Sequence, residues 1–295
     1  MAEAATLSRG GTGRPSLGRL STYWRRLYES PSTLFGTCVV LFFLFMAIFG
    51  PLVSPYGFAE QTAAIRQGPS AAHLFGTDGF GRDVLSRVLV GSRDIFVLSG
   101  TGTLIAVFIG LTLGLFSGYY GGLMDEVLMR LMDLLLAIPP LLLAMLLLAM
   151  VGPSTLNVVA VVAILYIPMV SRVVRSVVLE LKTKEFVEAA KTRGESSLYI
   201  MFQEILPNAV PPLIVEAAAR FSYSIFLIAS LGFLGLGVQP PSPNWGLMVA
   251  EARDAYSLAP WTLLFPSGAI SLMIVGVYMM SDGLRRILRP GLTGE

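Results

Sequence analysis

The sequence predicts an all-α integral membrane protein, because its composition is apolar, its long uncharged runs match a bilayer and its basic residues fall mostly on one side of them. Of the 295 residues, 54% are hydrophobic and only 14% are charged, with a mean hydropathy of +0.71. A soluble chain of this length needs more charge to cover its surface, so the excess apolar residues are expected to face lipid. The formal net charge of +2 is too small to favour nucleic acid as a partner.

Cysteine and histidine are too scarce for a disulfide framework or a metal centre. The chain has one of each, Cys38 and His73, and Cys38 is expected to be a small buried hydrophobe. The first thirty residues carry arginines but lack the apolar core and cleavage site of a secretory signal. We therefore expect the first apolar run to remain as a membrane anchor.

Six segments are long and apolar enough to cross a bilayer, which needs about 20 apolar helical residues. Gly152-Pro153-Ser154 divides one long uncharged stretch into two spans, and Pro139-Pro140 predicts a kink in the first of these two. The predicted spans are 33–53, 95–124, the two halves of 134–171, 213–237 and 261–281.

The loops predict that both termini are cytoplasmic. Fifteen Lys and Arg residues fall in the two terminal segments and the loops on their side, against five on the other side. The positive-inside rule therefore favours an N-in, C-in arrangement. The predicted organisation is a cytoplasmic N-terminal segment at 1–32, one transmembrane domain at 33–290 and a cytoplasmic tail at 291–295.

The connection after the first span is long and external, and its last part has an amphipathic pattern. In residues 82–94, apolar side chains gather on one side, while Asp83 and Arg87 are spaced to pair at i, i+4. This pattern predicts a helix that lies along the outer membrane interface.

Small residues recur at every fourth position of the second span. Such a stripe lets a neighbouring backbone approach closely, so helix packing is the favoured interpretation and a sliding surface along a transport path is the alternative. The stripe consists of Gly102, Ala106, Gly110, Gly114, Gly118 and Gly122.

Two further groups of charges lie in or beside the predicted spans. Glu126, Arg130 and Asp133 fall on one helix face, which predicts an ion-pair ladder at the cytoplasmic boundary. Glu216 and Arg220 are four residues apart within a span, where charges are costly. They either neutralise each other or line the inner mouth of a pathway, and the sequence leaves both interpretations open.

Signatures of soluble enzymes are missing from the sequence. None of the three lysines follows a glycine, so there is no P-loop for ATP, and no G-x-S-x-G nucleophile turn occurs. We therefore expect a chain that catalyses no covalent chemistry and binds no cofactor of its own.

The loop at about 182–208 holds all three lysines and is predicted to fold into two short helices. Residues 185–193 should form the first, ended by Gly194. Ser197 should cap the second at 198–204, and Leu206-Pro207-Asn208 should end it. A loop this long and organised between two spans indicates a docking site for a partner.

This loop resembles the EAA loop of ATP-binding-cassette (ABC) importer permeases. The resemblance rests on Glu188-Ala189-Ala190, Gly194 and Leu206-Pro207. It narrows to the second permease of the dipeptide, oligopeptide and nickel importers through an external motif and further matches between about 30 and 290. The external motif consists of Gly76, Thr77, Asp78, Gly81, Arg82 and Asp83, and the further matches include 233–237, 239–241 and 245–246.

The resemblance implies a transmembrane subunit that works by alternating access in the cytoplasmic membrane. Its partners would be a homologous permease, two P-loop ATPases that hold ATP and Mg, and an extracytoplasmic solute-binding protein. Glu188 would anchor the ATPase contact, Ala189 and Ala190 would permit close packing, and Gly194 would permit the bend. Short peptides are the expected solute, while nickel chelates, glutathione and oligosaccharides stay open.

Two other classes of protein are alternatives. A gradient-driven secondary transporter predicts acidic residues at mid-membrane and inverted repeats, neither of which is clear in the sequence. A scaffold that holds partners in the bilayer would transport nothing, and substrate-stimulated ATP hydrolysis would separate it from an importer.

Overall fold

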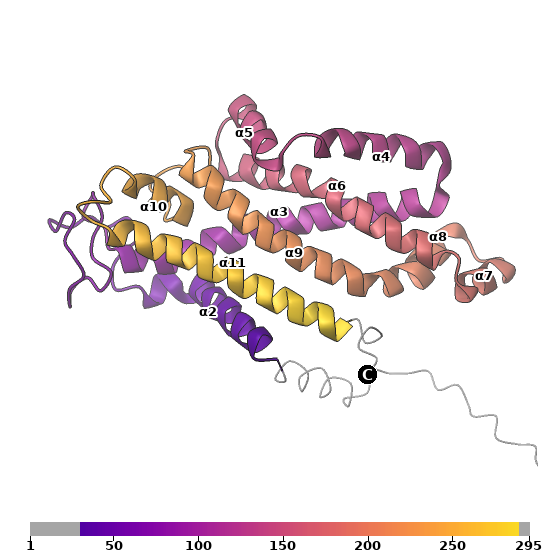
Figure 1. The fold of residues 1–295 in the computed structure, drawn as a ribbon, viewed down its shortest axis with the longest axis horizontal. Helices are drawn as coiled ribbons and strands as arrows, with labels where there is room; N and C mark the ends of the chain where they lie inside the picture. Colours follow the sequence, from indigo (N-terminus) through magenta and orange to yellow (C-terminus); the bar gives the residue numbers. More distant parts are fainter. Residues whose placement is uncertain (1–29, 289–295) are drawn as a thin grey trace, which may run out of the picture.

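The computed structural model describes residues 30–288, and within them helices run roughly parallel to one long axis (Figure 1). Five of these helices are long and apolar enough to span a membrane, and a bent helix pair provides a sixth span if it is counted as one. The predicted all-α membrane fold is therefore confirmed. The segment 1–29 and the tail from 289, which contain most of the predicted N-terminal segment and all of the tail at 291–295, lie outside the described residues.

The centre of the fold is the seam between α3 (Val84–Tyr120) and α6 (Thr155–Leu181). Four glycines of the stripe, at 102, 110, 114 and 118, face bulkier side chains of α6, whereas Gly122 begins α4 and has no atom within 4 Å of an added Cβ. A Cβ atom added at Gly102, Gly110 or Gly118 would lie within 3.0 Å of Val162, Val170 or Val178, respectively. The stripe is thus occupied within the chain, as the packing interpretation predicts.

A second close contact joins the first and last helices, α2 (Pro31–Val53) and α11 (Trp261–Leu288). A Cβ atom at Gly36 would lie 2.6 Å from the carbonyl oxygen of Gly276, so the two backbones nearly touch. Only part of α2 is covered in this way, and Cys38 is exposed on its remaining face. The expectation of a buried cysteine is wrong, because α2 buries a narrow stripe and leaves the other positions to lipid.

The third predicted span is broken. Helix α4 (Gly122–Leu136) and helix α5 (Pro140–Val151) meet at an angle of 88° around Pro139 and Pro140. The two prolines supply no backbone donors, which explains the break. The predicted division after α5 is also present, since Gly152 has a positive φ of 83° and α6 begins at Thr155. Figure 1 shows this pair along one edge of the bundle.

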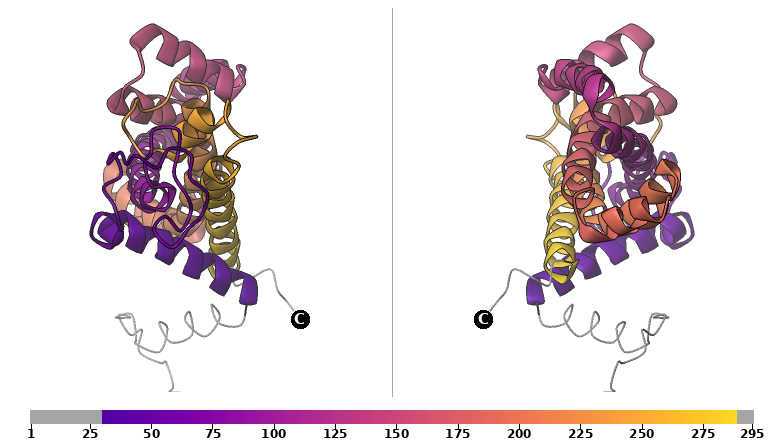
Figure 2. Two further views of the ribbon diagram at one scale, coloured as in Figure 1. Left: turned by 90° about the vertical axis from the view of Figure 1, so that its left-hand side faces the viewer. Right: turned by 90° about the vertical axis from the view of Figure 1, so that its right-hand side faces the viewer.

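The predicted helix at 82–94 is present from Val84 on, but it is not a separate helix along the membrane interface. These residues form the first turns of the 37-residue helix α3, and Arg87 is fully buried beneath the connection 54–83 and helix α10 (Trp245–Ala252). Asp83 does not pair with Arg87, because it caps α3 by accepting from the Ser86 amide at 2.7 Å and contacts His73 Nδ1 at 2.9 Å. The end of the bundle that carries these segments faces the viewer in the left view of Figure 2.

The opposite end carries α7 (Glu185–Thr192), α8 (Ser197–Tyr199) and the π-helical turn η1 (Ile200–Ile205), which continues into α9 (Leu206–Phe233). The second short helix therefore does not end at Leu206-Pro207, as the sequence predicts, but extends into the span. Pro207 is tolerated because it lies in the first turn of α9, where no intrahelical donor is needed. The cap is Ser196 rather than Ser197.

Candidate functional site

The loop at the right-hand end of Figure 1 is a compact turn of helix and not a flexible connection. Helix α7 ends in a Schellman motif: the Glu195 amide donates to the Ala190 carbonyl at 3.2 Å, and the Gly194 amide donates to the Lys191 carbonyl at 2.9 Å. Gly194 adopts a φ of +79°, which side chains disfavour. The predicted helix stop at Gly194 is therefore present.

Helix α7 is fixed to the membrane domain through its inner face. Val187 and Ala190 are fully buried and belong to one apolar cluster with Ile200, Met201 and Ile205. Ala190 consequently permits close packing inside the chain, on the face of α7 that lies against η1. Of the two alanines in this helix, only Ala189 is exposed.

The outer face of the same loop is exposed and carries both charged and apolar side chains. Glu188 and Gly194 are exposed, as is Pro207, while Leu206 is half-buried. Three large apolar side chains that the sequence analysis did not single out lie close by in the chain and are exposed. They are Leu198, Tyr199 and Phe202. Their position just after the Gly194 turn is the signal that could have identified them. The loop therefore presents an apolar tip beside an acidic helix.

Farther along α9, Glu216 and Arg220 contact each other as their spacing predicts. Arg220 Nε lies 2.7 Å from Glu216 Oε1, but neither atom has a partner with hydrogen-bond geometry. The pair is thus an ionic contact without a directed bond. The only directed contact of Arg220 among residues 30–288 is Nη1 to the Met169 sulfur at 2.7 Å, and a thioether is a weak acceptor.

These charges line hollows on both sides of α9, which we call the α9 groove. One hollow of about 700 Å³ lies between α9 and α11, and the other, of about 460 Å³, lies between α9 and the α5–α6 region. Arg220, Tyr223 and Phe226 line both. The Arg220 guanidinium lies 5.1 Å from the ring centre of Tyr223, which is itself more than half exposed. Asp282 and Arg285 of α11 also line the larger hollow, so the groove combines two acidic and two basic side chains with aromatic walls.

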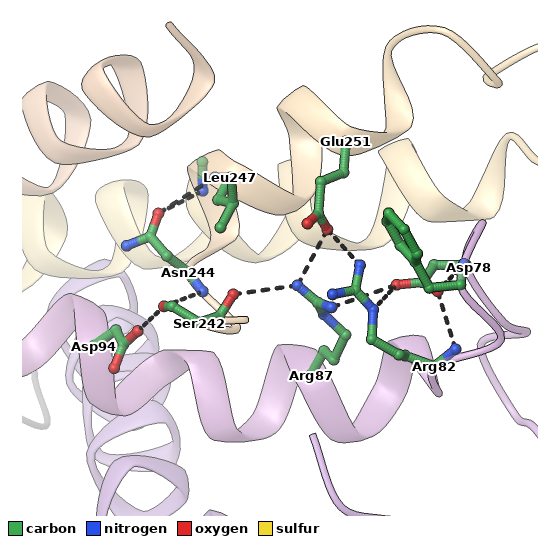
Figure 3. A network of polar contacts seen from close by, with 10 residues as sticks. Asp78, Arg82, Arg87, Asp94, Ser242, Asn244, Leu247 and Glu251 are labelled. Atoms are coloured by element: carbon green, nitrogen blue, oxygen red, sulfur yellow. Dashed lines mark hydrogen bonds and ion pairs between the residues drawn. The ribbon is translucent and has the colours of Figure 1, made fainter. Parts of the chain in front are cut away.

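The external motif forms a buried ion network with α10 (Figure 3). Asp78 Oδ2 accepts from Arg82 Nε at 2.6 Å and from Arg87 Nη1 at 3.4 Å. Glu251 Oε2 accepts from Arg82 Nη2 at 2.7 Å and from Arg87 Nη2 at 3.2 Å. Two carboxylates thereby hold two guanidiniums, and Arg87 Nη2 also donates to the Ser242 carbonyl at 3.2 Å. We call Asp78, Arg82, Arg87 and Glu251 the outer network.

The glycines of the motif allow the chain to close around this network. Gly76 and Gly81 both have positive φ, and a Cβ at Gly81 would lie 2.1 Å from the Thr62 carbonyl oxygen. The Thr77 carbonyl accepts from the Trp261 indole at 3.0 Å, which joins the motif to α11. Every residue that the sequence analysis named in this motif thus serves the architecture of one end of the bundle.

The predicted ladder on α4 is only partly present. Glu126 and Arg130 lie 3.8 Å apart and are exposed. Asp133 pairs with Arg172 of α6 instead of Arg130, because α4 lies beside α6 at that point.

Comparison with known proteins identifies the family. The family model described as binding-protein-dependent transport system inner membrane component matches residues 110–294, and the N-terminal domain model of oligopeptide transport permease C matches residues 18–69. The chain belongs to this permease family. Its function is accordingly that of a permease subunit of an ABC importer, and it is a multi-pass membrane protein.

Relatives match this permease over nearly its whole length. A dipeptide transport system permease protein of Alkalihalophilus pseudofirmus is 42% identical over 90% of this chain and 88% of its own. A di/tripeptide transport system permease protein of Pseudomonas aeruginosa is 38% identical over 92% of both chains. A glutathione transport system permease protein of Pectobacterium atrosepticum is 40% identical over 92% and 90%. The two family models together include the α7 loop, the α9 groove and part of the external connection of the permease.

Proposed function

We propose that this permease carries short peptides across the cytoplasmic membrane in an ABC importer. The observation that carries the proposal is the α7–α8 loop, which is held rigidly from inside by Val187 and Ala190 and presents Glu188, Ala189 and an apolar tip outward. A loop of this kind can transmit motion, since it is packed onto the same helix that lines the groove. The names of the relatives support peptides as the solute.

The partners in this proposal are a homologous permease, two P-loop ATPases and an extracytoplasmic solute-binding protein. ATP and Mg would be held by the ATPases, and this chain would be non-catalytic. Leu198, Tyr199 and Phe202 would enter an apolar groove of an ATPase while Glu188 contacts a basic residue there, because exposed apolar patches and buried charges both need partners. The α7 end would then be cytoplasmic, and the outer network would face the binding protein.

The solute path in this proposal follows the α9 groove, with Glu216 and Arg220 on its wall. A charge pair at membrane depth that retains access to an open hollow is typical of a transport path. The homologous permease would close the exposed side of the groove. A secondary transporter would instead couple uptake to a proton or sodium gradient.

The test is ATP hydrolysis by the complex reconstituted in lipid nanodiscs with its binding protein. Trialanine is expected to stimulate hydrolysis, and collapse of proton and sodium gradients is expected to leave uptake into proteoliposomes unchanged. Uptake that depends on a gradient and not on ATP would overturn the importer mechanism, and hydrolysis that no solute stimulates would favour a scaffold.

Gly194 tests the coupling role of the loop. No atom lies within 4 Å of a Cβ added there, so Gly194→Val meets no clash and perturbs only the positive φ, at about 1–2 kcal/mol. We expect the variant to insert normally, as judged by its amount in the membrane, and to lose peptide uptake. Gly194→Asn, which tolerates this φ, is the control and should retain most uptake. Normal transport by the valine variant would contradict a coupling role.

A further inference from the structure

The α9 groove carries an unsaturated charge pair, and this pair defines the chemistry of a ligand. Arg220 has five N–H donors, of which one makes a directed contact to a sulfur and one approaches Glu216 without hydrogen-bond geometry. Glu216 Oε2 has no hydrogen-bond partner among residues 30–288, and only Oε1 approaches Arg220. The pair therefore keeps free donors and free acceptors next to each other, at the edge of a hollow.

The pair is electrically neutral as a whole, which restricts what can bind. An anion alone would leave an excess negative charge at membrane depth, and a cation alone an excess positive charge, and both are costly there. A ligand with one ammonium and one carboxylate adds no net charge. Its carboxylate can accept from Arg220 and its ammonium can donate to Glu216 Oε2, so all four charged groups are compensated.

The walls of the groove fit a small organic zwitterion better than an inorganic ion. Tyr223, Phe226 and Tyr278 are each more than half exposed and line the hollow around the pair. Their rings supply apolar contact area together with hydroxyl groups, which suits a molecule with a variable, partly apolar body. The volume of about 700 Å³ lies within the range of small-molecule sites.

We propose that Glu216 and Arg220 form a binding subsite for the two charged termini of a zwitterionic short peptide, with Arg220 holding the carboxylate and Glu216 the ammonium. This rests on the proposed function, and deepens it by assigning the groups of the solute that the permease itself touches. The peptide binds to this subsite only transiently during transport, because Glu216 and Arg220 can pair with each other again when the peptide leaves.

The experiment compares uptake of trialanine, its C-terminal amide and its N-acetyl derivative by the reconstituted importer. The variant is E216Q/R220Q, which removes both charges, keeps a polar side chain at each position and leaves neither charge of the pair without its partner. The control is E126Q/R130Q on α4, with the same residue types at the same spacing but on an exposed surface. The binding protein is the same throughout, so its own preference cancels in the ratio of variant to wild-type uptake for each peptide.

We expect E216Q/R220Q to lower trialanine uptake by about tenfold, the loss typical of a charged hydrogen bond, and to lower uptake of the two blocked peptides less. E126Q/R130Q should change none of them. An equal loss for free and blocked peptides would show that the pair only shapes the helix, and unchanged trialanine uptake would also overturn the subsite. A wild-type importer that moves none of the peptides would instead overturn the peptide solute of the proposed function.

If the wild-type importer transports trialanine but not the blocked peptides, a photocross-link tests whether the peptide binds at Glu216 and Arg220. Benzoylphenylalanine in place of Tyr223 is expected to cross-link radiolabelled trialanine during turnover when Glu216 and Arg220 are present. The cross-link should fall by about tenfold in the E216Q/R220Q background. Equal cross-linking in both backgrounds would contradict the assignment.

Discussion

The permease contains two buried or half-buried charge groups that differ in how completely they are satisfied. In the outer network, Arg82 and Arg87 each make directed bonds to both Asp78 and Glu251. In the α9 groove, Arg220 has a single carboxylate neighbour and no directed bond to it. The difference indicates that the first group holds the architecture together, whereas the second is left open for a ligand.

The surroundings of the two groups agree with this contrast. Arg87 is fully buried between α3, the external connection and α10, and its Nη2 also donates to the Ser242 carbonyl (Figure 3), while its Nε has no partner with hydrogen-bond geometry among residues 30–288. Arg220 faces hollows on two sides of α9. A network in which two carboxylates and two guanidiniums share directed bonds in a closed site resists change, whereas a pair without a directed bond at an open site can exchange partners at small cost.

The largest effect is expected from breaking the outer network with Arg87→Met. The change leaves Asp78 and Glu251 buried with one guanidinium for two carboxylates, and removal of one partner from a buried ion group costs about 3–5 kcal/mol. We expect a loss of this size in the free energy of unfolding, measured by SDS titration in mixed micelles, together with less protein in the membrane.

Arg253→Met is the control for that variant. Arg253 follows α10 directly but is exposed, and its one ion pair among residues 30–288 is with its neighbour Asp254, at 3.5 Å. Its replacement should change stability by less than about 1 kcal/mol, as for other surface pairs. Similar losses in the two variants would mean that the outer network contributes no more than a surface ion pair, and the comparison would fail.

The sequence predicted the spans well, because hydropathy over about 20 residues depends only on neighbours in the chain. It failed at the outer network, because Arg87 and Glu251 are 164 residues apart and only the fold brings them together. The local i, i+4 rule assigned Asp83 to Arg87 instead. A helix N-cap competes for the same carboxylate, and Asp83 directly before the apolar start of α3 was a readable signal for that cap.

In the α7–α8 loop, too, the sequence predicted the local structure but not the contacts between elements. Helix α7 and its stop at Gly194 followed from local rules, since glycine favours the positive φ of a Schellman motif. Which alanine faces inward did not follow, because that depends on η1 packing beneath α7. The α6 valines that contact the glycine stripe were not predicted either, because the sequence does not show which helix packs against α3.

An intermediate effect is expected at the uncharged seam between α3 and α6. A Cβ at Gly114 would lie 2.5 Å from the Ser171 carbonyl oxygen and 2.7 Å from Val174 Cβ. Gly114→Leu should therefore separate α3 from α6 and lower the free energy of unfolding by about 1–3 kcal/mol, the usual cost of overpacking. The measurement is the same SDS titration.

Gly100→Leu is the matched control on the same helix, because no atom lies within 4 Å of a Cβ there. It should be neutral or slightly stabilising, since leucine favours helix more than glycine does. If both leucine variants lowered the free energy of unfolding equally, the loss would come from poorer insertion of α3 into the bilayer and not from overpacking of the seam.

The smallest effect on stability is expected at the α9 groove, where E216Q/R220Q removes both charges at once. The pair has no directed bond to lose, and neutral amides cost less to hold at membrane depth than ions do. The free energy of unfolding should change by less than about 1 kcal/mol, in contrast to Arg87→Met. A loss as large as that of Arg87→Met would place Glu216 and Arg220 in the architecture of the bundle. Unchanged stability with lost uptake of trialanine would leave solute binding as the reason that a charge pair is kept in this helix.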